Sequence, residues 1–164
     1  MHRADQAIRE EARRTVHEHG VDSAEYAALR ERGRAQDVAH RTRLSELVAE
    51  RGWPLVSHVG EAAARGAFFV VQHADLEFQR ALLPALRDAD AAGELPPALL
   101  PLLEDRVRVL GGRPQIYGTQ IRRAADGRPE PFPIEDESGV EARRAAAGLE
   151  PLDAYLRRFV VPGT

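Results

Sequence analysis

The sequence predicts a mainly α-helical fold: a single domain over residues 1–164, with about six to seven helices and a small β-hairpin or ordered loop near residues 114–134. Apolar residues recur at helical spacing along most of the chain. Glycine, proline and capping residues divide it into segments of helical length. Hydrophobic residues make up 43% and charged residues 30% of the chain, which is the balance of a globular protein.

The N-terminal half is expected to hold three helices. Residues 3–19 form the first, and Ser23 is placed to cap a second that reaches about Arg51. Residues 52–54, with the sequence Gly-Trp-Pro, end it, and a short extended stretch follows. Residues 60–74 then form the most apolar helix, which we expect to be central and buried.

The C-terminal half is expected to hold four more helices. They are bounded by glycine, proline or a capping residue, and span about 75–92, 96–110, 138–147 and 151–159. Pro96 and Pro97 suit the first turn of the second of these, and Ser138 is placed to cap the third. Residues 114–134 are the least helical part, and Asp126-Gly127 is typical of a hairpin turn.

Missing residue types exclude several kinds of chemistry. The chain has no Cys, so it forms no disulfide, thiol nucleophile, iron–sulfur cluster or thiolate zinc site. It also lacks Lys, which excludes a Schiff base and a P-loop lysine. All 23 basic residues are therefore Arg. Doublets such as Arg143-Arg144 are dispersed among acids and are expected on solvated surface.

Charge and hydropathy predict a soluble, cytoplasmic protein. The net charge of −3 and the absence of a basic helix face argue against nucleic acid as a partner. The longest apolar run is interrupted by Arg65 and falls short of the ~20 residues that span a bilayer. The first residues are polar, unlike a signal peptide. We expect no nucleic-acid and no membrane partner, and a homodimer is left open.

A set of polar side chains occupies positions where helical periodicity calls for apolar ones. They are Asp5, His73, Asp75, Gln79, Asp105 and Arg106. Burying such groups is costly unless they are paired. Taken singly, each can be a hydrogen-bonded structural residue, and Asp5 with Arg9 can be a simple ion pair within one helix. Taken together they predict a polar pocket.

The segment from Gln115 to Gln120 adds further polar groups around a glycine. It supplies two amides, the Tyr117 phenol and the Thr119 hydroxyl within six residues. Such a loop can line the mouth of a pocket. Alternatively, it is a turn whose polar side chains satisfy the local backbone.

These residues resemble a widespread bacterial family known only as a domain of unknown function. The motifs that carry the resemblance are Gln72-His73-Ala74-Asp75, Glu104-Asp105-Arg106 and Tyr117-Gly118-Thr119-Gln120, in that order. The likeness extends over nearly the whole chain. His40 stands where the family is expected to have Asn. The resemblance implies no established reaction and points only to the pocket residues.

The first functional hypothesis is a small enzyme that uses acid/base catalysis to hydrolyse, dehydrate or cyclise a small polar or anionic metabolite. His73 would transfer the proton, Asp75 or Asp105 would orient it, and Tyr117 would donate a hydrogen bond to a developing oxyanion. Substrate-binding residues are expected to be Asp5, Arg9, His40, Gln79, Arg106, Gln115, Thr119 and Gln120.

Two alternatives stay open. His40, His73, Asp37, Asp75 and Asp105 supply atoms that bind metals, but no recognised ligand spacing is present, so we expect no metal and no cofactor. The other alternative is a non-catalytic module that binds a small molecule or a protein partner through the same pocket.

Overall fold

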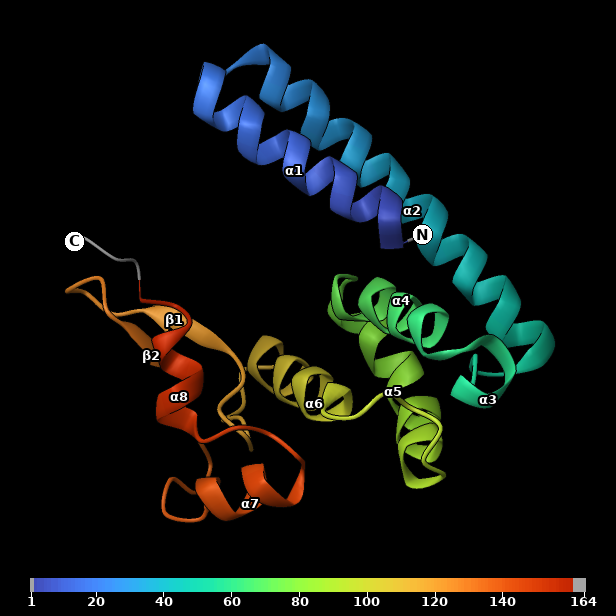
Figure 1. Ribbon diagram of the computed structural model, residues 1–164, viewed down its shortest axis with the longest axis vertical. Coiled ribbons are helices and arrows are strands. Elements are labelled where there is room, and N and C mark those ends of the chain that lie inside the picture. The colour runs from blue at the N-terminus through green and yellow to red at the C-terminus, as the bar shows by residue number, and fades with distance from the viewer. Residues whose placement is uncertain (1, 161–164) are drawn as a thin grey trace. The chain divides into compact units, whose positions relative to one another are not determined.

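The computed structural model describes the backbone of residues 2–160 and the side chains from Glu10 to Val160 (Figure 1). The described chain is mainly helical, with eight helices and one small antiparallel hairpin, which confirms the predicted fold class. It divides into two compact units, residues 1–74 and 75–164. Each unit is described separately, and the single domain expected over residues 1–164 stays a prediction.

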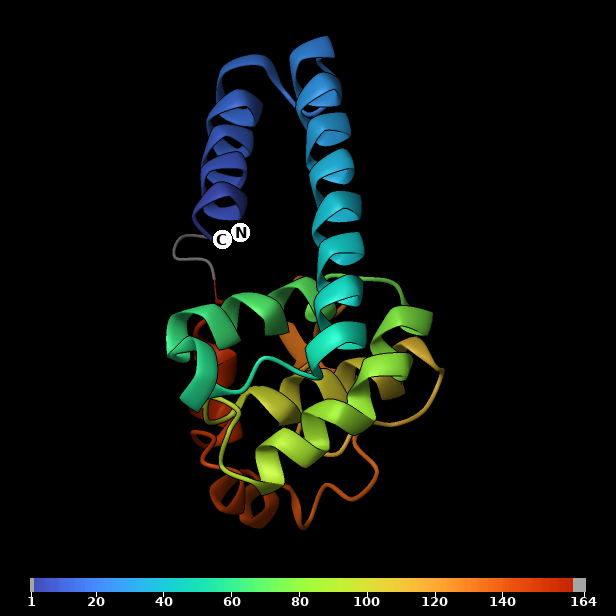
Figure 2. The ribbon, with the colours of Figure 1, turned by 90° about the vertical axis from the view of Figure 1, so that its right-hand side faces the viewer.

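The first unit begins with a helical hairpin made of α1 (His2–His19) and α2 (Ala24–Arg51), which pack side by side (Figure 2). The Ser23 hydroxyl accepts a hydrogen bond from the Tyr26 amide at 3.2 Å, as the expected N-cap of α2. The same hydroxyl donates to the Gly20 carbonyl at 2.9 Å. Ser23 therefore satisfies backbone groups on both sides of the turn.

Two further helices, α3 (Val56–Val59) and α4 (Glu61–Gln72), complete the first unit. The sequence predicted an extended stretch after residues 52–54, and this is wrong for residues 56–59. These residues form one helical turn, closed by a hydrogen bond from the Val59 amide to the Leu55 carbonyl. Helix α4 packs against α2. Its Ala64, Ala67 and Phe68 are buried, as its apolar composition predicts.

The second unit begins with α5 (Leu76–Ala91) and α6 (Leu99–Leu110), which pack through buried leucines. Asp75 is the N-cap of α5, and its Oδ1 accepts from the Phe78 amide at 2.9 Å. The start expected for α6 at Pro96-Pro97 is too early. Ala98 adopts a left-handed conformation with φ of 63°, so the helix begins only at Leu99.

A hairpin of β1 (Ile121–Arg123) and β2 (Pro129–Pro131) lies within the predicted region. The strands are antiparallel, with Ile121 opposite Pro131. Gly127 has a φ of 82°, and the Asp126 carboxylate accepts from the Arg128 amide at 3.0 Å across the turn. The Asp126-Gly127 pair thus forms the expected turn.

Two short helices, α7 (Val140–Ala146) and α8 (Leu152–Arg157), follow the hairpin. Ser138 does not cap α7 as expected, because Gly139 takes the N-cap position. Ser138 instead donates to Oδ1 of Asp136 at 2.7 Å, and the Gly139 amide approaches the same oxygen at 3.3 Å. A carboxylate is the stronger acceptor, so Asp136 organises this turn.

None of the helices in residues 2–160 combines the length and apolar composition needed to cross a bilayer.

We expect Ser23→Ala to lower the free energy of unfolding by about 1 kcal/mol, the usual loss when a serine N-cap is removed. Urea denaturation followed by circular dichroism measures it. Ser45→Ala is the matched control, because Ser45 is exposed within α2 and alanine favours a helix interior. Equal stability of the two variants would contradict the capping role.

Candidate functional site

Among the described residues of the second unit, the Asp105 carboxylate accepts the most hydrogen bonds. Asp105 lies on α6 and is fully buried. Its Oδ1 accepts from the Ile116 amide at 2.7 Å, and its Oδ2 accepts from both the amide and the hydroxyl of Thr119 at 2.9 Å. The Tyr117 amide lies 3.1 and 3.2 Å from the two oxygens. The loop is therefore wrapped around one buried charge.

Gln115 closes the same loop from the other side. This residue is also fully buried. Its amide nitrogen donates to the Gln120 carbonyl at 3.0 Å and the Phe132 carbonyl at 2.8 Å, and its amide oxygen accepts from the Gln120 amide at 2.9 Å. The side chain of Gln120 in turn reaches the Leu102 carbonyl on α6 at 3.3 Å.

Two carbonyl groups of the loop accept hydrogen bonds from side chains of α7 and α8. The Arg144 guanidinium donates to the Tyr117 carbonyl at 2.6 Å and to the Glu150 carbonyl at 2.7 Å. The Tyr155 hydroxyl donates to the Thr119 carbonyl at 3.0 Å. The guanidinium of Arg144 also lies 5.2 Å from the centre of the Tyr155 ring.

Arg144 and Tyr155 were missed by the sequence analysis. The expectation that the Arg143-Arg144 doublet lies on solvated surface is wrong for Arg144, which is 1% exposed. Burial lowers the pKa of this guanidinium, while nearby carboxylates, Glu141 first, raise it. An arginine nevertheless stays charged in proteins. The spacing of the doublet gave no signal of this burial, because one of the two partner carbonyls, that of Tyr117, lies 27 residues away in the sequence.

These contacts favour the structural interpretation of the loop from Gln115 to Gln120. Asp105, Gln115, Thr119 and Gln120 direct their polar atoms at one another and at backbone groups. A carboxylate that already accepts several hydrogen bonds has little capacity left to orient a catalytic histidine. Their roles in catalysis or substrate binding stay predictions.

Tyr117 points differently, since its side chain lines a shallow hollow with Asp90 and Arg143. Burial raises the pKa of the phenol, and the negative charges of Glu104 and Asp105 raise it further. The phenol is therefore neutral at neutral pH. It can donate a hydrogen bond but cannot act as a base there.

The remaining predicted residues of this unit are dispersed. Gln79 is fully buried on α5. Asp75 does not share its buried face as expected, because it precedes the helix as an exposed cap. Arg106 is half-buried, and its Nε has no hydrogen-bond partner among the described residues.

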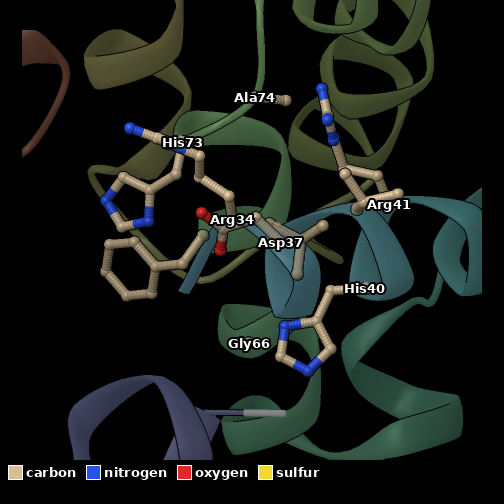
Figure 3. Close-up of a pocket in the computed structure, with 10 residues that line it drawn as sticks. Arg34, Asp37, His40, Arg41, Gly66, His73 and Ala74 are labelled. Atoms are coloured by element: carbon tan, nitrogen blue, oxygen red, sulfur yellow. The ribbon is translucent and has the colours of Figure 1, made fainter. Parts of the chain in front are cut away.

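A second hollow lies in the first unit, between α2 and α4 (Figure 3). Its volume is about 290 Å³. Arg34, Asp37, Val38, His40 and Arg41 line it from α2, while Gly66, Phe69, Val70, His73 and Ala74 line it from α4 and the residues that follow. We call it the α2–α4 hollow. It brings together two predicted site residues, His40 and His73.

The expectation that His73 points into the core is wrong, because His73 is exposed. It is the C-cap of α4, where the helix ends. Its ring stacks on Phe69 with centroids 5.9 Å apart and 18° between the planes. Figure 3 shows the two imidazoles on different sides of the hollow, with His40 beside Gly66.

Charge and apolar surface are both present in the α2–α4 hollow. Arg34 and Arg41 supply two guanidinium groups and Asp37 a single carboxylate. Arg34 also forms an ion pair with Glu31 at 2.9 Å. Val38, 51% exposed, contributes apolar surface beside Phe69 and Val70. An apolar wall with a few polar groups is typical of small-molecule sites.

No three His, Asp or Glu side chains gather as metal ligands among the described residues. Asp5 and Arg9 were expected to bind substrate, but their side chains lie outside the described residues, which begin at Glu10 for side chains.

A family model described as a family of unknown function (DUF6624) matches residues 1–161. No curated protein and no solved structure matches the chain. The match confirms the expected membership of a family of unknown function.

We expect Asp105→Asn to lower the free energy of unfolding by about 3 kcal/mol, because hydrogen bonds to a charged acceptor are worth about 1.5–3 kcal/mol each. The new amide group would also face donors instead of accepting from them. Urea denaturation gives the loss, and hydrogen exchange should show the Ile116 and Thr119 amides deprotected. Asp88→Asn, at an exposed position of α5, should change neither. An Asp105→Asn protein as stable as wild type would indicate a carboxylate kept for function.

Gly118→Ala is expected to destabilise the loop more than Gly127→Ala destabilises the hairpin turn. Both glycines have positive φ, 72° and 82°, where a side chain is strained. An added Cβ at Gly118 would lie 3.0 Å from a Leu152 methyl group, whereas nothing lies within 4 Å at Gly127. We expect a difference of about 1–3 kcal/mol from crowding alone, measured by urea denaturation. Equal losses would mean that the loop can shift to admit a methyl group.

Proposed function

The chain belongs to a family of unknown function, and we propose that it binds a small anionic molecule in the α2–α4 hollow. One observation carries the proposal. Two guanidiniums and one imidazole from α2, and a second imidazole at the end of α4, line one hollow beside an exposed apolar surface. Such groups are the usual protein donors to carboxylate and phosphate oxygens.

The donors around the hollow favour an anion over a cation. Two arginines and one carboxylate line it, and the Glu31 carboxylate that pairs with Arg34 is not among the lining residues. The fork of a guanidinium donates two parallel hydrogen bonds to an oxyanion. A positive potential at the rim would also draw an anion toward the hollow.

The size and the wall of the hollow favour a small ligand with an apolar portion. Its volume of about 290 Å³ is close to the lower end of the range for ligand pockets, roughly 300–1,000 Å³. Val38, Phe69 and Val70 supply the surface on which an aromatic or aliphatic group can lie. The ligand we propose is therefore a metabolite-sized carboxylate or phosphate ester.

Acid/base catalysis in the same hollow is the second candidate, and the pair of imidazoles favours it. Histidine is the side chain best suited to exchange protons near neutral pH. In this version His73 or His40 transfers the proton while Arg34 and Arg41 hold the anionic group. Asp75 and Asp105 have no orienting role in this version, because Asp75 caps α5 and Asp105 accepts its hydrogen bonds from the loop.

Titration of the ¹⁵N-labelled protein with benzoate and phenyl phosphate tests the binding proposal. We expect saturable shifts of amide signals in α2 and α4, weakened about tenfold in Arg34→Gln, since one charge-assisted bond is worth roughly 1.4 kcal/mol or more. Arg43→Gln is the matched control. Arg34 and Arg43 each pair with a glutamate three residues away on α2, but only Arg34 lines the hollow.

Binding that is the same in Arg34→Gln and Arg43→Gln would overturn the proposal, as would shifts that never saturate. If a substrate is found, His73→Gln and His40→Gln separate the two candidates. Loss of turnover with retained binding identifies catalysis, whereas a pure binding protein has no turnover to lose.

A further inference from the structure

The second unit contains a hollow of about 330 Å³ whose charged side chains are mostly arginines. Arg80 and Arg87 come from α5, while Arg108 and Arg113 come from α6 and the residues after it. Glu104 is the single acid that lines it. We call this the arginine hollow, and we propose that it binds an oxyanion of the phosphate class. This site is separate from the α2–α4 hollow and does not depend on its function.

Two of the four arginines are neutralised by carboxylates, and these two hold the walls of the hollow in place. Arg87 pairs with Glu104 at 2.8 Å. Arg108 pairs with Glu135 and also donates to the Pro114 carbonyl at 2.6 Å. Glu104 is only 13% exposed at its side chain, so its geometry is fixed by packing. These guanidiniums are therefore pre-oriented.

Arg80 and Arg113 have no such partner. Among the described residues, neither side chain forms a hydrogen bond or an ion pair with a side chain of the protein. Their charges therefore add to the positive potential in a partly enclosed space. An oxyanion between them would relieve that repulsion and accept from both.

The position of Arg80 has a structural explanation, but this explanation involves only some of the N–H donors of its guanidinium. A Cβ built on Gly111 would lie 2.7 Å from Nη2 of Arg80 and 3.0 Å from the Val107 carbonyl. The guanidinium therefore lies against the C-terminal end of α6, which carries a partial negative charge. A guanidinium has five N–H donors fixed in one plane, so they cannot all face one helix end.

The arginine hollow is distinguished by where its arginines lie and not by their residue type. The chain has no lysine, so the identity of any one base as arginine is uninformative. Four guanidiniums line this one hollow, and two carboxylates neutralise only half of them. Leu83, Val107 and Ile116 form its apolar floor. An ordinary solvated surface alternates its charges, as the pairs along α2 do.

The test is an NMR titration of the full ¹⁵N-labelled chain with inorganic phosphate and with phenyl phosphate, at ionic strength held constant with sodium chloride. We expect saturable shifts of the Nε–H signals of Arg80 and Arg113. Affinity should fall about tenfold in Arg80→Gln and in Arg113→Gln, the loss of one charge-assisted contact. Arg122→Gln, at an exposed arginine paired with Glu130 on the hairpin, should bind as wild type does.

Each outcome separates the possibilities. Equal binding of the two probes supports a free phosphate ligand, and tighter binding of phenyl phosphate supports a phosphate ester that uses the apolar floor. Shifts that do not saturate, or that survive in Arg113→Gln, indicate an adventitious ion only and overturn the proposal. Arg113→Gln leaves the end of α6 intact, so it remains decisive if Arg80→Gln unfolds. Arg34→Gln should leave these signals unchanged, so failure at one hollow is distinguishable from failure at the other.

Discussion

One buried negative charge holds the second unit together. Leaving the Asp105 carboxylate without partners would cost several kcal/mol, so the loop from Ile116 to Thr119 must place its donors around it. That arrangement turns the carbonyl groups of the loop outward, toward Arg144 on α7 and Tyr155 on α8. The positions of the two last helices therefore follow from an acid on α6. In the sequence, this structural cluster resembles an active site, because an active site and a buried hydrogen-bond cluster both need inward-facing polar residues.

Sequence predicted the helices well where a local signal marks their ends. Ser23 and Asp126-Gly127 did what their residue types favour, since a cap and a hairpin turn depend on neighbours within three residues. The errors arose where two local signals compete. The Asp136 carboxylate, and not the Ser138 hydroxyl, accepts the hydrogen bond from the Gly139 amide, because a carboxylate is the stronger acceptor. Ala98 adopts a backbone conformation that its residue type does not favour, and no pattern announces it.

The candidate site was predictable only in part. Periodicity identified Asp105 and Gln79 as inward-facing, which burial bears out, but it could not tell a loop-holding acid from a catalytic one. It placed His73 in the core because it assumed that α4 continues, whereas the helix ends there. The placement of His40 and His73 around one hollow, and the burial of Arg144, depend on packing between segments that are distant in the sequence. Local spacing patterns do not reveal such contacts.

The order in which the chain is synthesised gives the Asp105 cluster a consequence for folding. Asp105 leaves the ribosome before its nearest partner, eleven residues later, and Tyr155 bonds a carbonyl 36 residues before it. Until α8 has emerged, the Thr119 carbonyl lacks its hydrogen bond from Tyr155, although the donors to Asp105 are already present. Final ordering of the unit is thus delayed to the last turn of its last helix, as long-range contacts generally delay folding. A ribosome stalled short of residue 155 would hold a chain whose loop already surrounds Asp105 but lacks the hydrogen bond from Tyr155 that ties it to α8.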